Sequence, residues 1–238
     1  MCPLYRDHGM SADVVVGRTP KLRPAGVMTV KRGTRAAPRT ARVSVLFADL
    51  RGYTALAERL APAQIVPLLE EFFRVLAKAA TSHGGTVFHM AGDGMMAGFG
   101  GQSLAEDGAH EALIAGHSML QQFGKIAARW RRELAIETGI GVGVHLGEVA
   151  NVFLGPPGHK STTLVGDTVN VAARLCSRAR AGELLLSCTV ATALEIDEGE
   201  GELYIGPIPV LHLPQFALRG RSAPLDIWCV PAAERLAC

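Results

Sequence analysis

The chain has 238 residues, 48% of them hydrophobic and 19% charged, which is enough apolar material for a buried core and excludes general disorder. Its formal net charge of +2 is too small for nucleic-acid binding through overall charge. The five cysteines show neither CxxC nor metal-ligand spacing, which excludes a disulfide framework and a zinc site and predicts a protein of the reducing cytoplasm.

The charge is distributed unevenly along the chain. Residues 1–42 hold nine basic and two acidic side chains, whereas the rest holds 15 basic and 20 acidic ones. Because the basic stretch has no sustained apolar period, we expect a flexible arm over 1–42, with contact to an anionic surface as the alternative. A folded domain is expected over 43–232 and a short tail over 233–238. No segment is typical of a secretory signal or a membrane-spanning helix, so no membrane insertion is expected.

From residue 43 onward, segments whose hydrophobic residues have the spacing of a strand alternate with segments that have the spacing of a helix. The expected elements are, in order, a strand over 43–48, helices over 55–60 and 64–80, a hairpin over 86–99 around an Asp-Gly turn, a helix over 104–134, a strand over 138–146, a strand over 162–165, a helix over 167–178, a strand over 183–187, a helical turn over 189–194, and antiparallel strands over 203–230. This β-α-β-β-α-β order predicts an α+β, ferredoxin-like fold with additional C-terminal antiparallel strands. In the strand over 138–146, glycine alternates at Gly139, Gly141 and Gly143, which predicts close approach of a neighbouring backbone.

Two carboxylates stand out by position. Asp49 follows an apolar strand and Asp93 lies in the hairpin turn, so both would emerge at one edge if these strands pair. Mg²⁺ is commonly held by one or two carboxylates together with substrate phosphates. Either aspartate alone is more often a helix or turn cap. Next to Asp49, the turn at Gly52, Tyr53 and Thr54 offers backbone N–H groups that suit phosphate binding.

A second pair of polar residues lies on the expected helix over 167–178. Asn170 and Arg174 are four residues apart and therefore share one face of that helix. Fixed donors of this kind suit the dispersed negative charge of a phosphoryl-transfer transition state. From periodicity alone, an exposed polar stripe is the simpler interpretation.

Four blocks taken together resemble the signature blocks of class III nucleotidyl cyclases, and they occur in the family's order over about residues 43–230. The blocks are Phe47–Thr54, Ala91–Ala97, Gly141–Val149 and Gly166–Arg174. The resemblance implies the ferredoxin-like cyclase fold and a homodimer with two composite active sites at its interface. A heterodimer with another cyclase-type chain is the alternative.

The resemblance also implies roles for individual residues. Asp49 and Asp93 match the aspartates that hold two Mg²⁺ or Mn²⁺ ions per site, with the backbone carbonyl of Leu50 as a further ligand. Asn170 and Arg174 match the transition-state pair, which the other protomer donates.

Two further positions match those that read the purine base. Thr163 resembles the residue found at this position in the bicarbonate-responsive subgroup. At position 89 this chain has His89 where the family usually has lysine. A histidine that merely lines its strand is the alternative for His89. A guanylyl cyclase would be expected to carry Glu at 89 and Cys at 163, so the resemblance favours ATP, converted to 3′,5′-cyclic AMP and pyrophosphate. The alternatives are a guanylate cyclase and a catalytically weak cyclase-fold module that binds or regulates.

Two other features depart from the family pattern. The loop over 151–160, with its Gly-Pro-Pro-Gly run, is longer than usual and lies near the dimer interface in such enzymes. The phosphate-binding lysine of the C-terminal strands has no clear counterpart, and Arg219 and Arg221 are the candidates to replace it.

Overall fold

The computed structural model describes residues 40–100, 107–156, 158–196, 203–216 and 224–232. The helices are α1 (Tyr53–Arg59), α2 (Pro62–Ser82), α3 (Ala109–Leu134), α4 (Asp167–Arg178) and α5 (Cys188–Ala193). The strands are β1 (Thr40–Leu50), β2 (Thr86–Ala91), β3 (Gly94–Phe99), β4 (Ile140–Leu154), β5 (Ser161–Val165), β6 (Leu184–Ser187), β7 (Leu203–Ile205), β8 (Ile208–Phe216) and β9 (Leu225–Val230).

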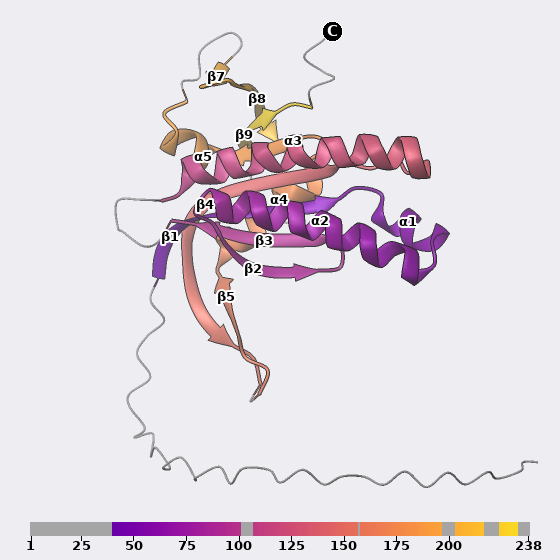
Figure 1. Cartoon of the computed structure of the whole chain (residues 1–238). Helices are drawn as coiled ribbons and strands as arrows, with labels where there is room; N and C mark the ends of the chain where they lie inside the picture. Colours follow the sequence, from indigo (N-terminus) through magenta and orange to yellow (C-terminus); the bar gives the residue numbers. More distant parts are fainter. Residues whose placement is uncertain (1–39, 101–106, 157, 197–202, 217–223, 233–238) are drawn as a thin grey trace, which may run out of the picture. The chain divides into compact units, whose positions relative to one another are not determined.

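One sheet organises these elements, in the order β2-β3-β1-β4-β6-β9-β8-β7, with β5 paired to β4 outside this path (Figure 1). β4 and β6 run parallel, and the other neighbouring strands are antiparallel. β1, β2, β3 and β4, with the helices between them, form the β-α-β-β-α-β unit of a ferredoxin-like fold. The predicted fold class is therefore confirmed, and β7, β8 and β9 supply the expected C-terminal antiparallel strands.

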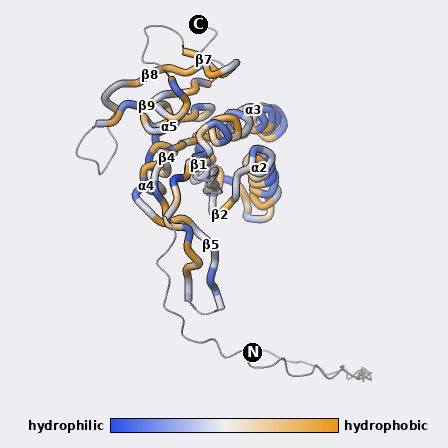
Figure 2. Tube along the Cα trace, turned by 90° about the vertical axis from the view of Figure 1, so that its left-hand side faces the viewer, coloured by the Kyte–Doolittle hydropathy of each residue, from blue (hydrophilic) through white to orange (hydrophobic). Residues whose placement is uncertain are grey.

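The two faces of the sheet are covered by different helices. α2 and α3 cover one face and α4 covers the other (Figure 2). Because side chains alternate along a strand, Leu46 and Leu50 of β1 join the core under α2 and α3, whereas Val43 and Val45 pack on the α4 face. The alternation places Asp49 on the α4 face as well.

The alternating glycines in β4 and just before it mark places of close approach, as predicted. A Cβ atom at Gly143 would lie 2.7 Å from the carbonyl oxygen of Ala172 and 2.8 Å from Cα of Cys176, so the backbone of α4 packs directly on β4. At Gly139 the close neighbour is Ala181. Gly141 differs, because the group that fills its space is the side chain of Arg51.

Replacing Gly143 by Ala is expected to lower the free energy of unfolding by about 2–3 kcal/mol, because the added methyl group meets backbone atoms of α4 that cannot rotate away. Gly124→Ala is the matched control. Gly124 lies within α3, and a Cβ atom there would have no neighbouring atom within 4 Å. Helix propensity predicts that this substitution raises the free energy of unfolding by about 1 kcal/mol. Urea unfolding of both variants measures the difference. A Gly143→Ala variant as stable as the wild type would contradict the described packing of α4.

Three element boundaries differ from the prediction by three residues or more. β1 begins at Thr40 rather than at residue 43, because residues 40–42 pair with residues 148–150 of β4. Residues 40–42 of the predicted arm thus belong to the sheet, and residues 1–39 and the tail 233–238 lie outside the described residues. β4 continues to Leu154 because β5 pairs with its second half. α3 begins at Ala109, where the Asp107 side chain accepts a bond from the Ala109 amide, and 101–106 lie outside the described residues.

Among the helices of the described residues, none is both long and apolar enough to cross a membrane.

Candidate active site

Asp49 and Asp93 come together because β1 and β3 are neighbours in the sheet. Asp49 lies opposite Gly94 in the β1–β3 register, and the Leu50 amide donates a hydrogen bond to the Asp93 carbonyl at 2.9 Å. The Asp49 side chain is 32% exposed, and Asp93 is half-buried. The pairing of the two strands on which the sequence argument depended is thus present, and it brings both carboxylates to one edge.

The electrostatics of Asp49 reflect three neighbours. Burial raises the pKa of the Asp49 carboxyl above its ordinary value, the Arg51 guanidinium opposes that rise, and the nearby Asp93 carboxylate adds to it. Two carboxylates that repel each other at the end of a strand form a site where a cation lowers the energy of both charges.

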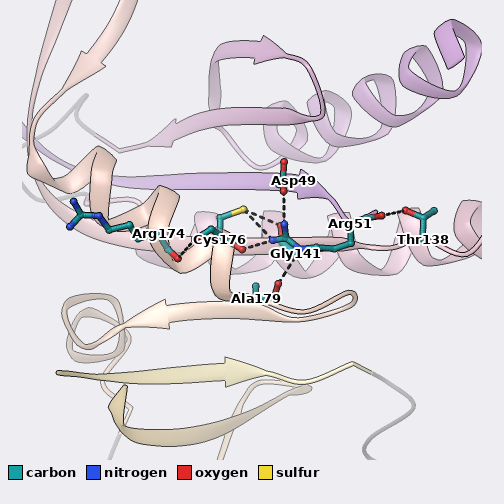
Figure 3. Close-up of polar contacts among 8 residues, drawn as sticks. Asp49, Arg51, Thr138, Gly141, Arg174, Cys176 and Ala179 are labelled. Carbon is teal, nitrogen blue, oxygen red and sulfur yellow. Dashed lines mark hydrogen bonds and ion pairs between the residues drawn. The ribbon is translucent and has the colours of Figure 1, made fainter. Parts of the chain in front are cut away.

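The Arg51 side chain is a central part of this site, although no role was predicted for it from the sequence. Its Nη1 forms an ion pair with Oδ2 of Asp49 (Figure 3). On the other side of the guanidinium, Nε donates to the Ala179 carbonyl at 3.0 Å and Nη2 donates to the Cys176 carbonyl. The glycine at 141, which leaves the space for this guanidinium, was the one available signal.

His89 lies on the same face of the sheet as Asp49, and a β-bulge puts it there. Val87 pairs with Ala97 but His89 pairs with Met96, so the register shifts between them. Without the shift, His89 would share the face of Val87, which packs against the α2–α3 core. The His89 side chain is exposed.

Asn170 and Arg174 both lie on α4. Asn170 is exposed and Arg174 half-buried, whereas Val171 and Leu175 of the same helix are fully buried. The Arg174 guanidinium points away from Asp49 (Figure 3). Within one chain, the structure therefore does not bring Arg174 and Asp49 together.

The remaining predicted residues take separate positions. Gly52, with φ of +79°, precedes α1, whose first residues are Tyr53, packed against the core, and Thr54, which is exposed. Thr163 is half-buried on β5, opposite Val152 of β4. The candidate replacements for the phosphate-binding lysine, at 219 and 221, lie outside the described residues.

The buried cysteine of α4 is a packing residue. Burial raises the pKa of the Cys176 thiol to about 12, so it stays protonated, and it donates to the Gly141 carbonyl at 3.3 Å. A thiol of this kind is a small buried hydrophobe and not a nucleophile.

The comparisons with known proteins agree with this geometry. The family model for the adenylate and guanylate cyclase catalytic domain matches residues 36–210. An adenylate cyclase of Anabaena cylindrica is 29% identical over 160 residues, which are 64% of this chain and 30% of that protein. This chain thus spans under a third of the length of the curated relatives that it matches.

Solved structures give the same result. The adenylyl cyclase CyaB from P. aeruginosa superimposes with a TM-score of 0.73 at 27% identity, covering 84% of this chain and 98% of that one. The guanylyl cyclase Cya2 gives a TM-score of 0.69 at 26% identity, covering 82% and 94%. Because the family model covers most of the chain and the folds agree, the chain belongs to the adenylate and guanylate cyclase catalytic domain family.

Proposed function

We propose that the chain is a cytoplasmic adenylate cyclase that converts ATP to 3′,5′-cyclic AMP and pyrophosphate as a homodimer with two composite active sites. The observation that carries the proposal is the juxtaposition of Asp49 and Asp93 at one edge of the sheet, in a chain of the cyclase family. The similar proteins of known structure include both an adenylyl and a guanylyl cyclase, so the choice of base rests on residues of this chain.

The residues at this edge fit a divalent cation such as Mg²⁺ or Mn²⁺. Asp49 and Asp93 offer hard oxygen ligands, and the pairing of β1 with β3 holds these two residues next to each other. In the part of the chain that the structure describes, no cluster of three or more ligating side chains exists, so the Leu50 carbonyl and the substrate phosphates would complete the coordination. When bound, two such ions would lower the pKa of the ribose 3′-hydroxyl and neutralise the triphosphate.

The other residues bind and orient the substrate in this proposal. Backbone N–H groups at Gly52, Tyr53 and Thr54 bind the phosphates beside Asp49. From the second protomer, Asn170 orients the ribose so that the 3′-oxygen attacks the α-phosphorus in line, and Arg174 stabilises the negative charge that develops there.

Two observations support the homodimer. The Arg174 guanidinium is directed away from Asp49 of its own chain, so it would serve a site formed with another chain. The β4–β5 pair also exposes three large apolar side chains, namely Phe153 at 66%, Leu154 at 59% and Val165 at 47%. The register of β4 with β5 places Phe153 on one face and Leu154 and Val165 on the other, so both faces offer apolar surface to another chain. Analytical ultracentrifugation of the purified chain distinguishes a homodimer from the alternative, a monomer that needs another cyclase-type chain.

His89 and Thr163 are the proposed readers of the base. A neutral imidazole and a hydroxyl can each donate or accept, so these two residues can meet the amino group and N1 of adenine. The pair that would favour GTP, Glu at 89 and Cys at 163, is absent. Thr163 is also the feature that favours the bicarbonate-responsive subgroup, and stimulation of cyclic AMP formation by bicarbonate tests that assignment.

The wild-type chain is expected to use ATP with a higher kcat/KM than GTP, and His89→Lys is expected to increase that ratio by about tenfold. An unsatisfied polar group in the base pocket costs about 1–3 kcal/mol, which sets this magnitude. His110→Lys, which changes an exposed histidine of α3, is the control and should leave the ratio unchanged. Equal use of both nucleotides by the wild type, or a shift of His89→Lys toward GTP, would overturn the proposed reading of the base.

A further inference from the structure

The Arg51 guanidinium joins the end of β1 to the C-terminal end of α4, which is distant from it in sequence. Its acceptors are the Asp49 carboxylate and the carbonyls of Cys176 and Ala179, which lie 125 and 128 residues further along the chain. Cys176 is in the last turn of α4, and Ala179 is its C-cap. A cation there also complements the negative end of the helix dipole.

Hydrogen bonds and close packing fix both the backbone and the side chain of Arg51. The Arg51 amide donates to the Gly139 carbonyl at 2.8 Å, and the Arg51 carbonyl accepts from Oγ1 of Thr138 at 2.7 Å, so the backbone is fixed to the segment before β4. A Cβ at Gly141 would lie 2.6 Å from Nε of Arg51, so only glycine leaves room for the guanidinium. The Arg51 side chain is 23% exposed, unlike that of a solvated surface arginine.

We propose that Arg51 is a positioning residue for both composite sites of the dimer. This inference rests on the proposed function. Through Asp49, Arg51 orients a metal ligand in the site built on its own protomer. Through Cys176 and Ala179, it fixes the C-terminal end of α4, and thereby Asn170 and Arg174, which serve the site built on the other protomer.

The geometry requires an arginine rather than a positive charge alone. The three oxygen acceptors and the Cys176 sulfur, 3.8 Å from Nη2, lie around one planar guanidinium, and each of its nitrogens has a partner. A lysine ammonium is a single point charge and cannot bind the Asp49 carboxylate and the carbonyls at the end of α4 with the geometry of a guanidinium. A displacement of catalytic groups by about 1 Å can reduce turnover about a hundredfold, so loosening α4 is expected to be visible in kcat.

Mixed dimers with one intact site separate the two roles. One protomer carries Asp49→Ala and the other carries Arg174→Ala, and the mixed dimer is purified with two different affinity tags. The intact site then uses Asp49 of the second protomer and α4 of the first. Arg51→Gln in the first protomer can affect that site only through α4, and in the second protomer only through Asp49.

In the first protomer, Arg51→Gln is expected to lower kcat about tenfold to a hundredfold while the half-saturating Mn²⁺ concentration stays within about twofold. Arg51→Lys there is expected to behave like Arg51→Gln. In the second protomer, Arg51→Gln is expected to shift the half-saturating Mn²⁺ concentration by at least about threefold, because Oδ2 of Asp49 loses its partner. The control is Arg178→Gln in the first protomer, which removes a charge from the same turn of α4 and should leave kcat unchanged.

Hydrogen exchange of the metal-free chain provides a readout that does not depend on activity. The Ala179 amide donates to the Leu175 and Cys176 carbonyls, and its exchange is expected to accelerate at least about tenfold in Arg51→Lys. The Gly85 amide, bonded to Ala80 at the end of α2, is the internal control. Inactivity of the parent mixed dimer would contradict the composite site itself. The proposed role of Arg51 would be overturned if the Ala179 amide exchanged at the same rate in Arg51→Lys as in the wild type. It would also be overturned if the mixed dimer with Arg51→Lys in its first protomer kept the kcat of the parent mixed dimer.

Discussion

Replacing Asp49 by Ala is expected to lower the rate of cyclic AMP formation by on the order of a thousandfold while the chain stays folded, and Asp93→Ala is expected to do the same. The loss is large because each variant removes a carboxylate that the proposed metal ions require, and metal ions stabilise phosphoryl-transfer charge by several kcal/mol. Initial rates across titrations of Mg²⁺ and Mn²⁺ measure the effect.

The fold should tolerate these changes because the Asp49 side chain is 32% exposed and Arg51 retains the carbonyls of Cys176 and Ala179. Thermal unfolding of each variant checks this point. Glu58→Ala, which removes an exposed carboxylate from α1, is the matched control and should keep full activity. An Asp49→Ala or Asp93→Ala variant that retains substantial activity at any metal concentration would show that these residues do not hold the metal ions.

Mixing two inactive variants, Asp49→Ala and Arg174→Ala, is expected to restore activity. A mixed dimer contains one site that lacks both groups and one site that has both, because Asp49 and Arg174 of a composite site come from different protomers. With random exchange of subunits, about a quarter of the wild-type rate should return. Activity is followed after mixing, and subunit exchange is monitored independently by fluorescence energy transfer between labelled chains.

A mixture of Asp49→Ala and Asp93→Ala is the matched negative control. Both substitutions affect the same half of a composite site, so each mixed dimer has two damaged sites and should stay inactive. If the Asp49→Ala and Arg174→Ala mixture remains inactive although its subunits exchange, or if the control mixture recovers equally, the shared site is wrong.

The order of the elements and the position of the two aspartates could be predicted because they depend on local patterns. A β-rich apolar run ending at Asp49 and the Asp-Gly turn at Asp93 are both readable from a few neighbouring residues. The glycines at 139 and 143 also indicated close packing correctly, because a missing side chain in a strand has few other physical reasons.

The contacts of Arg51 could not be predicted in this way, because its partners on α4 are more than a hundred residues distant. The face of His89 depends on a register shift after Val87, and a bulge leaves no clear mark in a sequence that otherwise alternates regularly. The full length of β4, to Leu154, depends on pairing with β5, which is a tertiary contact and not a propensity.

Identifying the reaction product tests most directly whether the chain converts ATP to cyclic AMP. The purified chain is incubated with ATP and Mn²⁺ or Mg²⁺, and the products are separated by chromatography and identified by mass spectrometry. An adenylate cyclase is expected to yield 3′,5′-cyclic AMP and pyrophosphate in equal amounts, and to form cyclic AMP from ATP faster than cyclic GMP from GTP. Nucleotide binding without any cyclic product, or release of ADP and phosphate, would contradict this expectation.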